Sequence, residues 1–203
     1  LLDPVEDRGE IAAIKEKTQK VLSVPRPITP IAIPLRAGLS VYDVTDPRAA
    51  VKFDADGSGI SRPWSWITAD AGWLVYDQVG TRRVTSALQL FGNVTFWMFW
   101  ESGYDALAAL DDDESGWLSG EELRFLAIWR DANRNGVSEA GEVQPLAAHG
   151  IVALSCRSEI DAAHPDEIRW ARAGVTLADG SARPTWDLVL HPRPTPMRVT
   201  FGR

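Results

Sequence analysis

The chain has 203 residues, 45% of them hydrophobic, with 21 Lys and Arg against 28 Asp and Glu, which gives a formal net charge of −7. This size and apolar content indicate one domain with a substantial core, alone or with an appendage. The acidic balance, without a strongly basic block, argues against nucleic acid as a partner. No apolar run has the length of a transmembrane helix, and the single cysteine, Cys156, excludes an internal disulfide.

The first 36 residues divide into two segments. Residues 1–23 predict a surface helix, because five residues recur at helical spacing. Residues 24–36 carry four prolines, which excludes a helix interior and predicts a linker or an edge-strand arm. We take 1–28 as a helix and Pro-rich arm, 29–191 as the main domain and 192–203 as an extended tail. The residues of the helical stripe are Ile11, Ile14, Thr18, Val21 and Leu22.

Strand-like segments at 40–44 and 50–53 lead into an Asp- and Gly-rich segment. Asp54, Asp56 and Ser58 stand at positions one, three and five of a calcium loop, and Ile60 stands at position seven. Position twelve falls on Ser65 rather than on an acid, so an ion here needs an outside ligand. Asp70 is the nearest acid downstream. An ordinary hairpin turn explains the same residues and stays open as the alternative.

The following region contains a short buried strand at 73–76 and a segment, 77–89, with the length of another ion loop. That segment has Val79 at position three and Arg82 at position six, so we predict a structural turn without an ion. Residues 95–100 then form an aromatic run that cannot place all of its side chains on one face. Burial on both faces is the commoner arrangement, and exposure to a partner or a membrane surface is the alternative. We predict that Phe96–Trp100 is at least in part a contact surface.

Two acidic twelve-residue segments, 111–122 and 131–142, match the calcium loop of an EF-hand position by position. A short helix over 104–110 leads into the first loop, and we expect residues 123–130 to form a helix that joins the loops. Two solvated acidic turns are the alternative, and the full pattern would then have to arise twice. The predicted ligands are Asp111, Asp113, Ser115, the Trp117 carbonyl, Ser119 and Glu122, and then Asp131, Asn133, Asn135, the Val137 carbonyl, Glu139 and Glu142.

The spacing of these loops has a physical cause. Calcium takes six to eight oxygen ligands, which alternate residues of a tightly turning loop can aim at one centre. The sixth residue must adopt positive φ, which Gly116 and Gly136 do at no steric cost. In the first loop, Ser119 and Glu122 also fit a capping box. We therefore predict two calcium ions and leave open a third at Asp54.

The C-terminal part predicts further short elements. Residues 143–149 read as a short helix ended by Gly150. Strands are expected at 151–156, 170–177 and 186–190, with a hairpin at Asp179-Gly180 and a loop at 157–169. The three histidines are scattered, which indicates surface or hydrogen-bonded residues, and Cys156 reads as a buried inert thiol. The expected fold class is α+β, with EF-hand-like calcium loops, short helices and small antiparallel strands and hairpins.

The order of these segments resembles one known family over roughly residues 29–190. The most specific stretch is LAIWRDANRNGVSEAGEVQPL, and the LFG at 90–92 adds to it. The family is the calcium-dependent self-processing module of iron-regulated proteins of the repeats-in-toxin class. The resemblance implies EF-hand-like calcium sites and, in processing members, cleavage of an Asp-Pro bond through an aspartic anhydride that a lysine can capture. That bond would fall at Thr29-Pro30 here, and the family's next acidic loop corresponds to residues 34–38, which carry no acid.

These expectations lead to a functional hypothesis. We expect a calcium-binding, non-catalytic structural or interaction module, periplasmic or secreted, that is a non-processing relative of that family. Its partners would be other proteins, such as subunits of an envelope-associated assembly, contacted through residues 1–36 and Phe96–Trp100. Contact with a membrane surface, without spanning it, stays open. Calcium-dependent self-processing with transpeptidation is the alternative activity.

Overall fold

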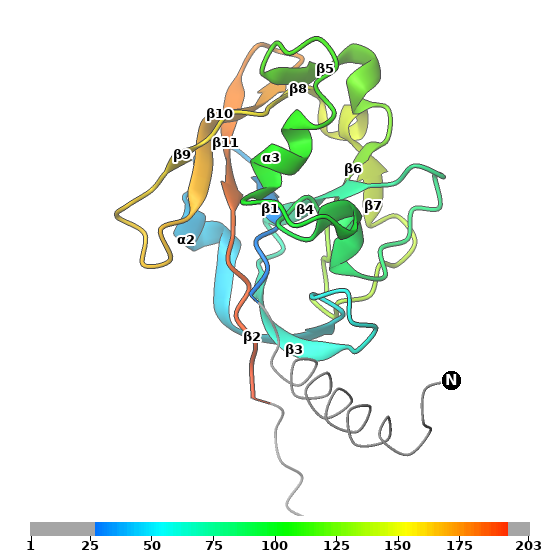
Figure 1. Ribbon diagram of the computed structural model, residues 1–203, viewed down its shortest axis with the longest axis vertical. Helices are drawn as coiled ribbons and strands as arrows, with labels where there is room; N and C mark the ends of the chain where they lie inside the picture. The colour runs from blue at the N-terminus through cyan, green and yellow to red at the C-terminus, as the bar shows by residue number, and fades with distance from the viewer. Residues whose placement is uncertain (1–26, 195–203) are drawn as a thin grey trace, which may run out of the picture.

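The computed structural model describes residues 27–194 (Figure 1). The helix expected over residues 1–23 and the end of the expected tail, from residue 195, lie outside the described residues. Within the described part, no helix is long and apolar enough to cross a membrane.

One large antiparallel sheet organises the described chain. The separate hairpin of β2 and β3 lies below it in Figure 1. The central strands of the large sheet bring distant parts of the sequence together, because Ile31 lies opposite Asp187 and Ala32 lies opposite Trp73. The strand order is β5 (Trp117–Ser119), β8 (Ile151–Ser155), β10 (Arg169–Leu177), β11 (Ala182–Asp187), β1 (Ile31–Pro34), β4 (Ala71–Tyr76), β6 (Leu126–Trp129) and β7 (Val143–Pro145), with β9 (Glu159–Ile160) on β10, and the hairpin pairs β2 (Thr45–Phe53) with β3 (Arg62–Ile67).

The expected α+β class with an EF-hand-like fold is wrong, because the described residues are mainly antiparallel sheet. The α-helices among them are α2 (Val41–Val44), where a strand was expected, and α3 (Gly103–Ala108), which matches the predicted helix before the first loop. The remaining helical segments are the 3₁₀ turns η1 (Ala87–Gln89), η2 (Thr95–Trp97), η3 (Gly120–Leu123) and η4 (Leu146–His149).

The segment between the two acidic loops is the clearest correction. Residues 123–130 were expected to be a helix, but they contain β6, an inner strand between β4 and β7. Leu126 and Ile128 enter one core, whereas Ala127 and Trp129 enter the other. A strand that is buried on both faces has no polar alternation, so its apolar run has the same appearance as a buried helix. The two loops are therefore joined through the sheet.

Strand β1 corrects a second expectation. The Pro-rich arm was expected to be a linker or an edge strand, but Ile31–Pro34 is an inner strand with β11 on one side and β4 on the other. Its prolines interfere little, because Pro34 is the last residue of the strand and Pro30 lies just before it.

Two hydrophobic cores fill the two sides of the sheet. The first is aromatic: Trp66 packs edge-on against Trp73 and Trp129, with ring centroids 5.3 and 5.7 Å apart, and Phe53 of the β2–β3 hairpin joins them. The second core lies under α3 (Figure 1), where buried Tyr104 donates its hydroxyl to the Thr185 carbonyl at 2.8 Å. Helix α3 thus fixes the start of the first acidic loop, and β6 fixes the start of the second.

The aromatic run is divided between core and surface. Phe96 packs against Tyr76 and Phe91, with ring centroids 5.0 and 5.9 Å apart. Burial of the whole run is wrong, because Trp97, Met98 and Phe99 are 72%, 52% and 86% exposed. These three consecutive residues therefore expose large apolar side chains to solvent.

Candidate metal centre

The first acidic loop, residues 111–122, begins three residues after α3 and ends in η3. The Asp111 carboxylate accepts hydrogen bonds from the backbone N–H groups of Ser115, at 3.1 Å, and Gly116, at 2.7 Å. Asp113 also accepts from the Ser115 N–H, at 3.0 Å. Gly116 has φ of +84°, as the sixth position of a calcium loop requires. The first half of the loop therefore turns its side-chain oxygens inward.

Glu122 closes this loop. Its two carboxylate oxygens accept from the backbone N–H groups of Asp112, at 2.9 Å, and Ser119, at 2.8 Å. The bond to Ser119 belongs to the capping box that the sequence predicted at the start of η3. One side chain thus joins the beginning of the loop to its end.

The second loop, residues 131–142, repeats these bonds position by position. Asp131 accepts from Asn135, at 3.0 Å, and from Gly136, at 2.9 Å, and Asn133 accepts from Asn135 at 3.1 Å. Glu142 accepts from Ala132 at 2.9 Å and from Glu139 at 3.1 Å. The backbone agrees as well, because positions four and six have positive φ in both loops. The two loops share one geometry.

The two loops differ in their surroundings. In the first, oxygens of Asp111, Asp113 and Glu122 all lie within 4.8 Å of one another, which is the one such group of acids found among residues 27–194. In the second, Asp131 is 1% exposed, and the indole of Trp66 donates to its Oδ2 at 2.8 Å. Hydrogen bonds from Ser115 lower the pKa of Asp113, whereas burial raises the pKa of Asp131. Two of the other predicted ligands of the first loop contact each other, because Ser115 Oγ donates to the Trp117 carbonyl at 2.9 Å. In the second loop, Glu139 accepts from the side-chain amides of Asn133 and Asn135.

The half-loop at residues 54–60 has the first part of the same geometry. Asp54 accepts from Gly59 N–H at 3.1 Å, and Asp56 accepts from Ser58 N–H at 3.2 Å. A guanidinium already lies against these oxygens: Arg62 contacts Asp56 Oδ2 at 2.9 Å and Ser58 Oγ at 3.5 Å. Arg62 occupies position nine of the pattern, a signal that was readable in the sequence but not used.

Asp70 does not join the half-loop. It lies in the turn between β3 and β4, where its carboxylate pairs with Arg36 at 3.1 Å. Ile60, the expected carbonyl ligand, is 47% exposed. Of the five residues proposed for a third ion, Asp56 and Asp70 are therefore held in two separate ion pairs, with Arg62 and Arg36.

A fourth loop of this shape lies at residues 77–89, where the sequence indicated a turn without an ion. Asp77 accepts from the N–H groups of Thr81, at 2.9 Å, and Arg82, at 3.0 Å, and both Gly80 and Arg82 have positive φ. Gln89 Oε1 accepts from Thr85 N–H at 2.8 Å, as the closing glutamate does in the acidic loops. The backbone form is kept although the acids at the other ligand positions are missing.

These loop geometries coincide with a match to a known family. Residues 36–191 match the family model described as the SPM domain, which is well over half of the chain. The chain belongs to the SPM-domain family of self-processing modules. It is also 32% identical over 155 residues to the iron-regulated protein FrpA of Neisseria meningitidis serogroup C. That alignment covers 70% of this chain and 13% of FrpA, so the chain spans a small fraction of the relative's length.

The SPM match includes all four loops and begins after Thr29-Pro30, the bond singled out by the family resemblance. Residues on both sides of this bond are hydrogen-bonded to other parts of the chain. Asn93 Oδ1 accepts from Thr29 N–H at 3.2 Å, and the Pro30 carbonyl accepts from Leu188 N–H at 3.0 Å. A side chain at Gly92 would meet the Thr29 carbonyl at 2.7 Å, so glycine is required there.

A buried acid accompanies this bond and was not found from the sequence. Asp187 is 3% exposed and accepts from Gly103 N–H at 3.0 Å. Burial raises the pKa of Asp187 to about 8, and the nearby Thr29 hydroxyl lowers it in part. Neither Thr29 Oγ1 nor Asp187 Oδ1 meets hydrogen-bond geometry with a described group. Nothing in the local pattern at 182–190 distinguished Asp187 from an exposed strand residue.

Proposed function

We propose that this chain is a calcium-binding module with two ion sites, at residues 111–122 and 131–142. The observation that carries the proposal is the shared geometry of the two loops. In both, the side chain at position one accepts from the backbone N–H of position six, and the glutamate at position twelve accepts from the backbone N–H of position two. Oxygens from carboxylates, amides, hydroxyls and backbone carbonyls suit a hard cation of calcium's size. Calcium would neutralise clustered carboxylates such as Asp111, Asp113 and Glu122.

We assign no ion to the half-loop at 54–60. The Arg62 guanidinium supplies the positive charge that Asp56 would otherwise take from a metal, and both side chains are mostly shielded from solvent. An arginine cannot release its proton at any accessible pH, so its charge is permanent. The expected stoichiometry is therefore two.

We propose a structural and non-catalytic role outside the cytoplasm, periplasmic or secreted. Calcium is near millimolar concentration there, which would fill the weak sites that are typical of extracellular calcium-binding modules. Two loops attached to opposite parts of one sheet would stiffen it and fix the surfaces around it. The exposed part of the aromatic run, Trp97–Phe99, then serves as a contact for other proteins.

Self-processing is the second candidate, and one observation favours it besides the family. The buried Asp187 carboxyl, protonated at neutral pH, lies beside the Thr29-Pro30 bond. Anhydride formation, however, needs a carboxylate on the residue before the proline, and Thr29 offers a hydroxyl. Intact mass after incubation with calcium tests the choice: we expect an uncut chain that has taken up calcium.

A further inference from the structure

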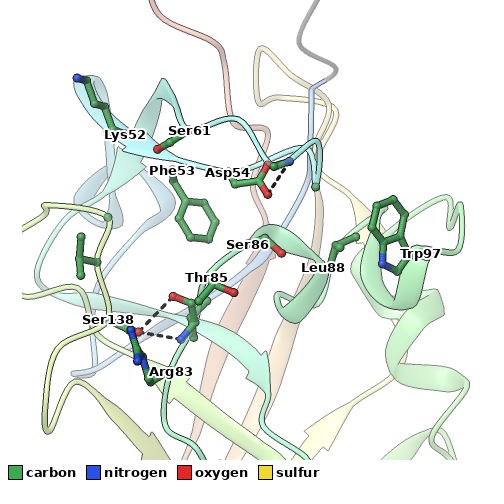
Figure 2. A pocket seen from close by; sticks show the side chains of 15 residues that line it. Lys52, Phe53, Asp54, Ser61, Arg83, Thr85, Ser86, Leu88, Trp97 and Ser138 are labelled. Carbon is green, nitrogen blue, oxygen red and sulfur yellow. Dashed lines mark hydrogen bonds between the residues drawn. The ribbon is translucent and has the colours of Figure 1, made fainter. Parts of the chain in front are cut away.

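A cleft of about 610 Å³ lies where the second acidic loop, the half-loop and the aromatic run come together (Figure 2). Its lining includes Phe53, Leu88 and Trp97, and Figure 2 shows Leu88 and Trp97 at the same end. The Lys52 side chain points away from the cleft, and the other charged lining residues are one arginine and one aspartate. Charge therefore selects no ligand here, and the apolar side chains are the distinctive feature.

Exposed apolar side chains gather around this cleft. Five of the nine large hydrophobic residues that are exposed among residues 27–194 lie in the segments that form it. Two of them line the cleft directly, and a third, in the half-loop, stands between two lining residues. An exposed apolar surface that is assembled from separate segments is typical of a docking site. The five residues are Ile60, Trp97, Met98, Phe99 and Val137.

The backbone of the aromatic run keeps its apolar tip outside the core. Phe96 and Trp97 both have φ of +59°, a conformation that residues other than glycine rarely adopt. The Phe96 ring is fixed by edge-on contacts with two neighbouring aromatic rings, whose centroids lie 5.0 and 5.9 Å away. The Trp100 N–H donates to the Asn93 carbonyl at 3.1 Å and closes the loop. The tip, Trp97–Phe99, is therefore held in an exposed position.

The chain enters the described part at the base of this same loop. Asn93 Nδ2 donates to the Pro27 carbonyl at 3.3 Å, and Asn93 Oδ1 accepts from Thr29 N–H at 3.2 Å. The chain before Pro27 is therefore attached at a residue only four positions from Trp97. Residues 1–26 lie outside the described residues, and their sequence predicts a helix with one apolar stripe. An isolated helix of this length is marginal in water, so such a stripe needs a surface to cover it.

We propose that residues 11–22 dock as a helix across this cleft and cover Ile60, Trp97 and Val137 with their apolar stripe. The lengths are compatible, because twelve helical residues span about 18 Å and the four residues that join them to Pro27 reach about 13 Å when extended. Because helix and cleft belong to one chain, a high effective concentration favours even a weak contact. The stripe consists of Ile11, Ile14, Thr18, Val21 and Leu22.

The docked helix acts as a removable cover. It occupies the Trp97–Phe99 surface that a partner protein would contact, so partner binding requires the helix to leave. This consequence rests on the proposed function, whereas the docking itself does not. The contact lies outside the sheet and its two cores, so its loss leaves the melting temperature of the sheet unchanged.

The test is hydrogen exchange of the full chain, read by mass spectrometry at neutral pH in calcium. We expect the amides of residues 11–22 to exchange at least about threefold more slowly in the wild type than in the stripe variant Ile14→Asn, Val21→Asn. The matched control Glu16→Asn, Lys20→Asn introduces the same residue twice on the opposite face of the helix. It should keep the wild-type exchange rates.

The cleft provides an independent pair of variants. The double variant Ile60→Ser, Trp97→Ser should speed the exchange of residues 11–22 as much as the stripe variant does. Tyr42→Ser, Ile160→Ser is its control, because Tyr42 and Ile160 are 67% and 56% exposed and do not line the cleft. This control should keep the slow exchange, and all variants should keep the wild-type melting temperature.

Met98 reports the reverse effect. Hydroxyl-radical oxidation of Met98 should rise at least about twofold when the stripe variant uncovers the tip of the run. Exchange of residues 11–22 that is as fast in the wild type as in the stripe variant, or that is unchanged in the cleft variant, would overturn the proposal. Slow exchange of residues 195–203 instead would assign the cover to the other end of the chain, and slowing that grows with protein concentration would assign it to a second copy. Either result would also overturn the proposal, and calcium titration reports the proposed function separately.

Discussion

The indole of Trp66 donates a hydrogen bond to Asp131 Oδ2 at 2.8 Å, and this bond joins the centre of the aromatic core to the first residue of the second acidic loop. The Trp66 side chain is 1% exposed and packs against Trp73 and Trp129. The core therefore holds a proposed calcium ligand in place, and changes in the core should reach the ion.

Trp66→Phe should weaken calcium binding at the second loop about tenfold or more, because it removes the donor that orients a buried ligand. The measurement is calcium titration on a Glu122→Gln background, in which the first loop is disabled. Trp64→Phe is the matched control, because the Trp64 indole is equally buried but donates to the Phe53 carbonyl at 3.1 Å. It should lower stability without changing calcium affinity. Equal affinities in the two variants would disprove the link.

The closing glutamates give a second prediction. Glu122→Gln and Glu142→Gln should each weaken calcium binding by about tenfold or more and lower the melting temperature in calcium, because each removes a charge from the ligand set. Glu121→Gln is the control, since Glu121 is an exposed residue at position eleven of the first loop, which supplies none of the predicted ligands. If all three variants bind calcium like the wild type, the ligand assignment is wrong. Differential scanning calorimetry with and without calcium gives the second readout.

The turn chemistry of the four loops was readable from the sequence because it is local. In each loop the first aspartate accepts a backbone N–H from a residue five positions later, so the bond that forms the turn lies within a few residues of sequence. Residues 77–89 had the length of another ion loop in the sequence, and the structure shows the same turn there, with positive φ at Gly80 and Arg82.

The sheet was less predictable because its partners are distant. Ile31 pairs with a strand more than 150 positions later, and no periodicity within residues 31–34 records that pairing. Leu126–Trp129 is apolar throughout, so its strand form is decided by β4 and β7 on either side. Asp187 gave no local signal, because its burial results from the approach of Gly103 and Thr29.

Asp187 predicts a specific pH dependence of stability. Its folded pKa of about 8 lies above the unfolded value near 4, so the folded state keeps a proton that the unfolded state releases between these pH values. Stability should therefore fall as pH rises from 5 to 8. Asp187→Asn should remove this fall, a relative gain on the order of 3–5 kcal/mol at pH 8, measured by urea unfolding.

Asp179→Asn is the control for this series. Asp179 lies in the β10–β11 turn, where hydrogen bonds from Ser181 lower its pKa. It stays ionised from pH 5 to 8 in both states, so its variant should keep the wild-type slope. A wild-type slope in Asp187→Asn would show that the acid does not titrate as proposed.

The aromatic run predicts different results for its two tryptophans. Trp100 is partly buried, and its indole donates to the Thr95 carbonyl at 2.9 Å, so Trp100→Ser should destabilise the fold by about 1–3 kcal/mol. Trp97→Ser should change stability by less than about 0.5 kcal/mol, because Trp97 is 72% exposed. Thermal unfolding in calcium measures both. A large loss in Trp97→Ser would show that its ring is core rather than contact surface.

The chain should not cut itself. Wild-type protein incubated overnight with calcium should keep its intact mass, because Thr29 lacks the carboxylate for anhydride formation. Thr29→Asp alone should give little or no cleavage, since residues 34–38 have no acids and Arg36 there pairs with Asp70. Acids restored in 34–38 as well should be needed before calcium triggers a cut. A wild-type fragment beginning at Pro30 would establish the self-processing activity instead.

Calcium titration of the wild-type chain by calorimetry tests the central claim most directly. With loops 111–122 and 131–142 as the sites and Arg62 in place of a third ion, the expected result is uptake of two calcium ions at or below millimolar concentration. The Arg62→Gln variant should keep at least these two. No heat of binding at millimolar calcium, or a calcium affinity that is unchanged in the double variant Glu122→Gln, Glu142→Gln, would contradict the account.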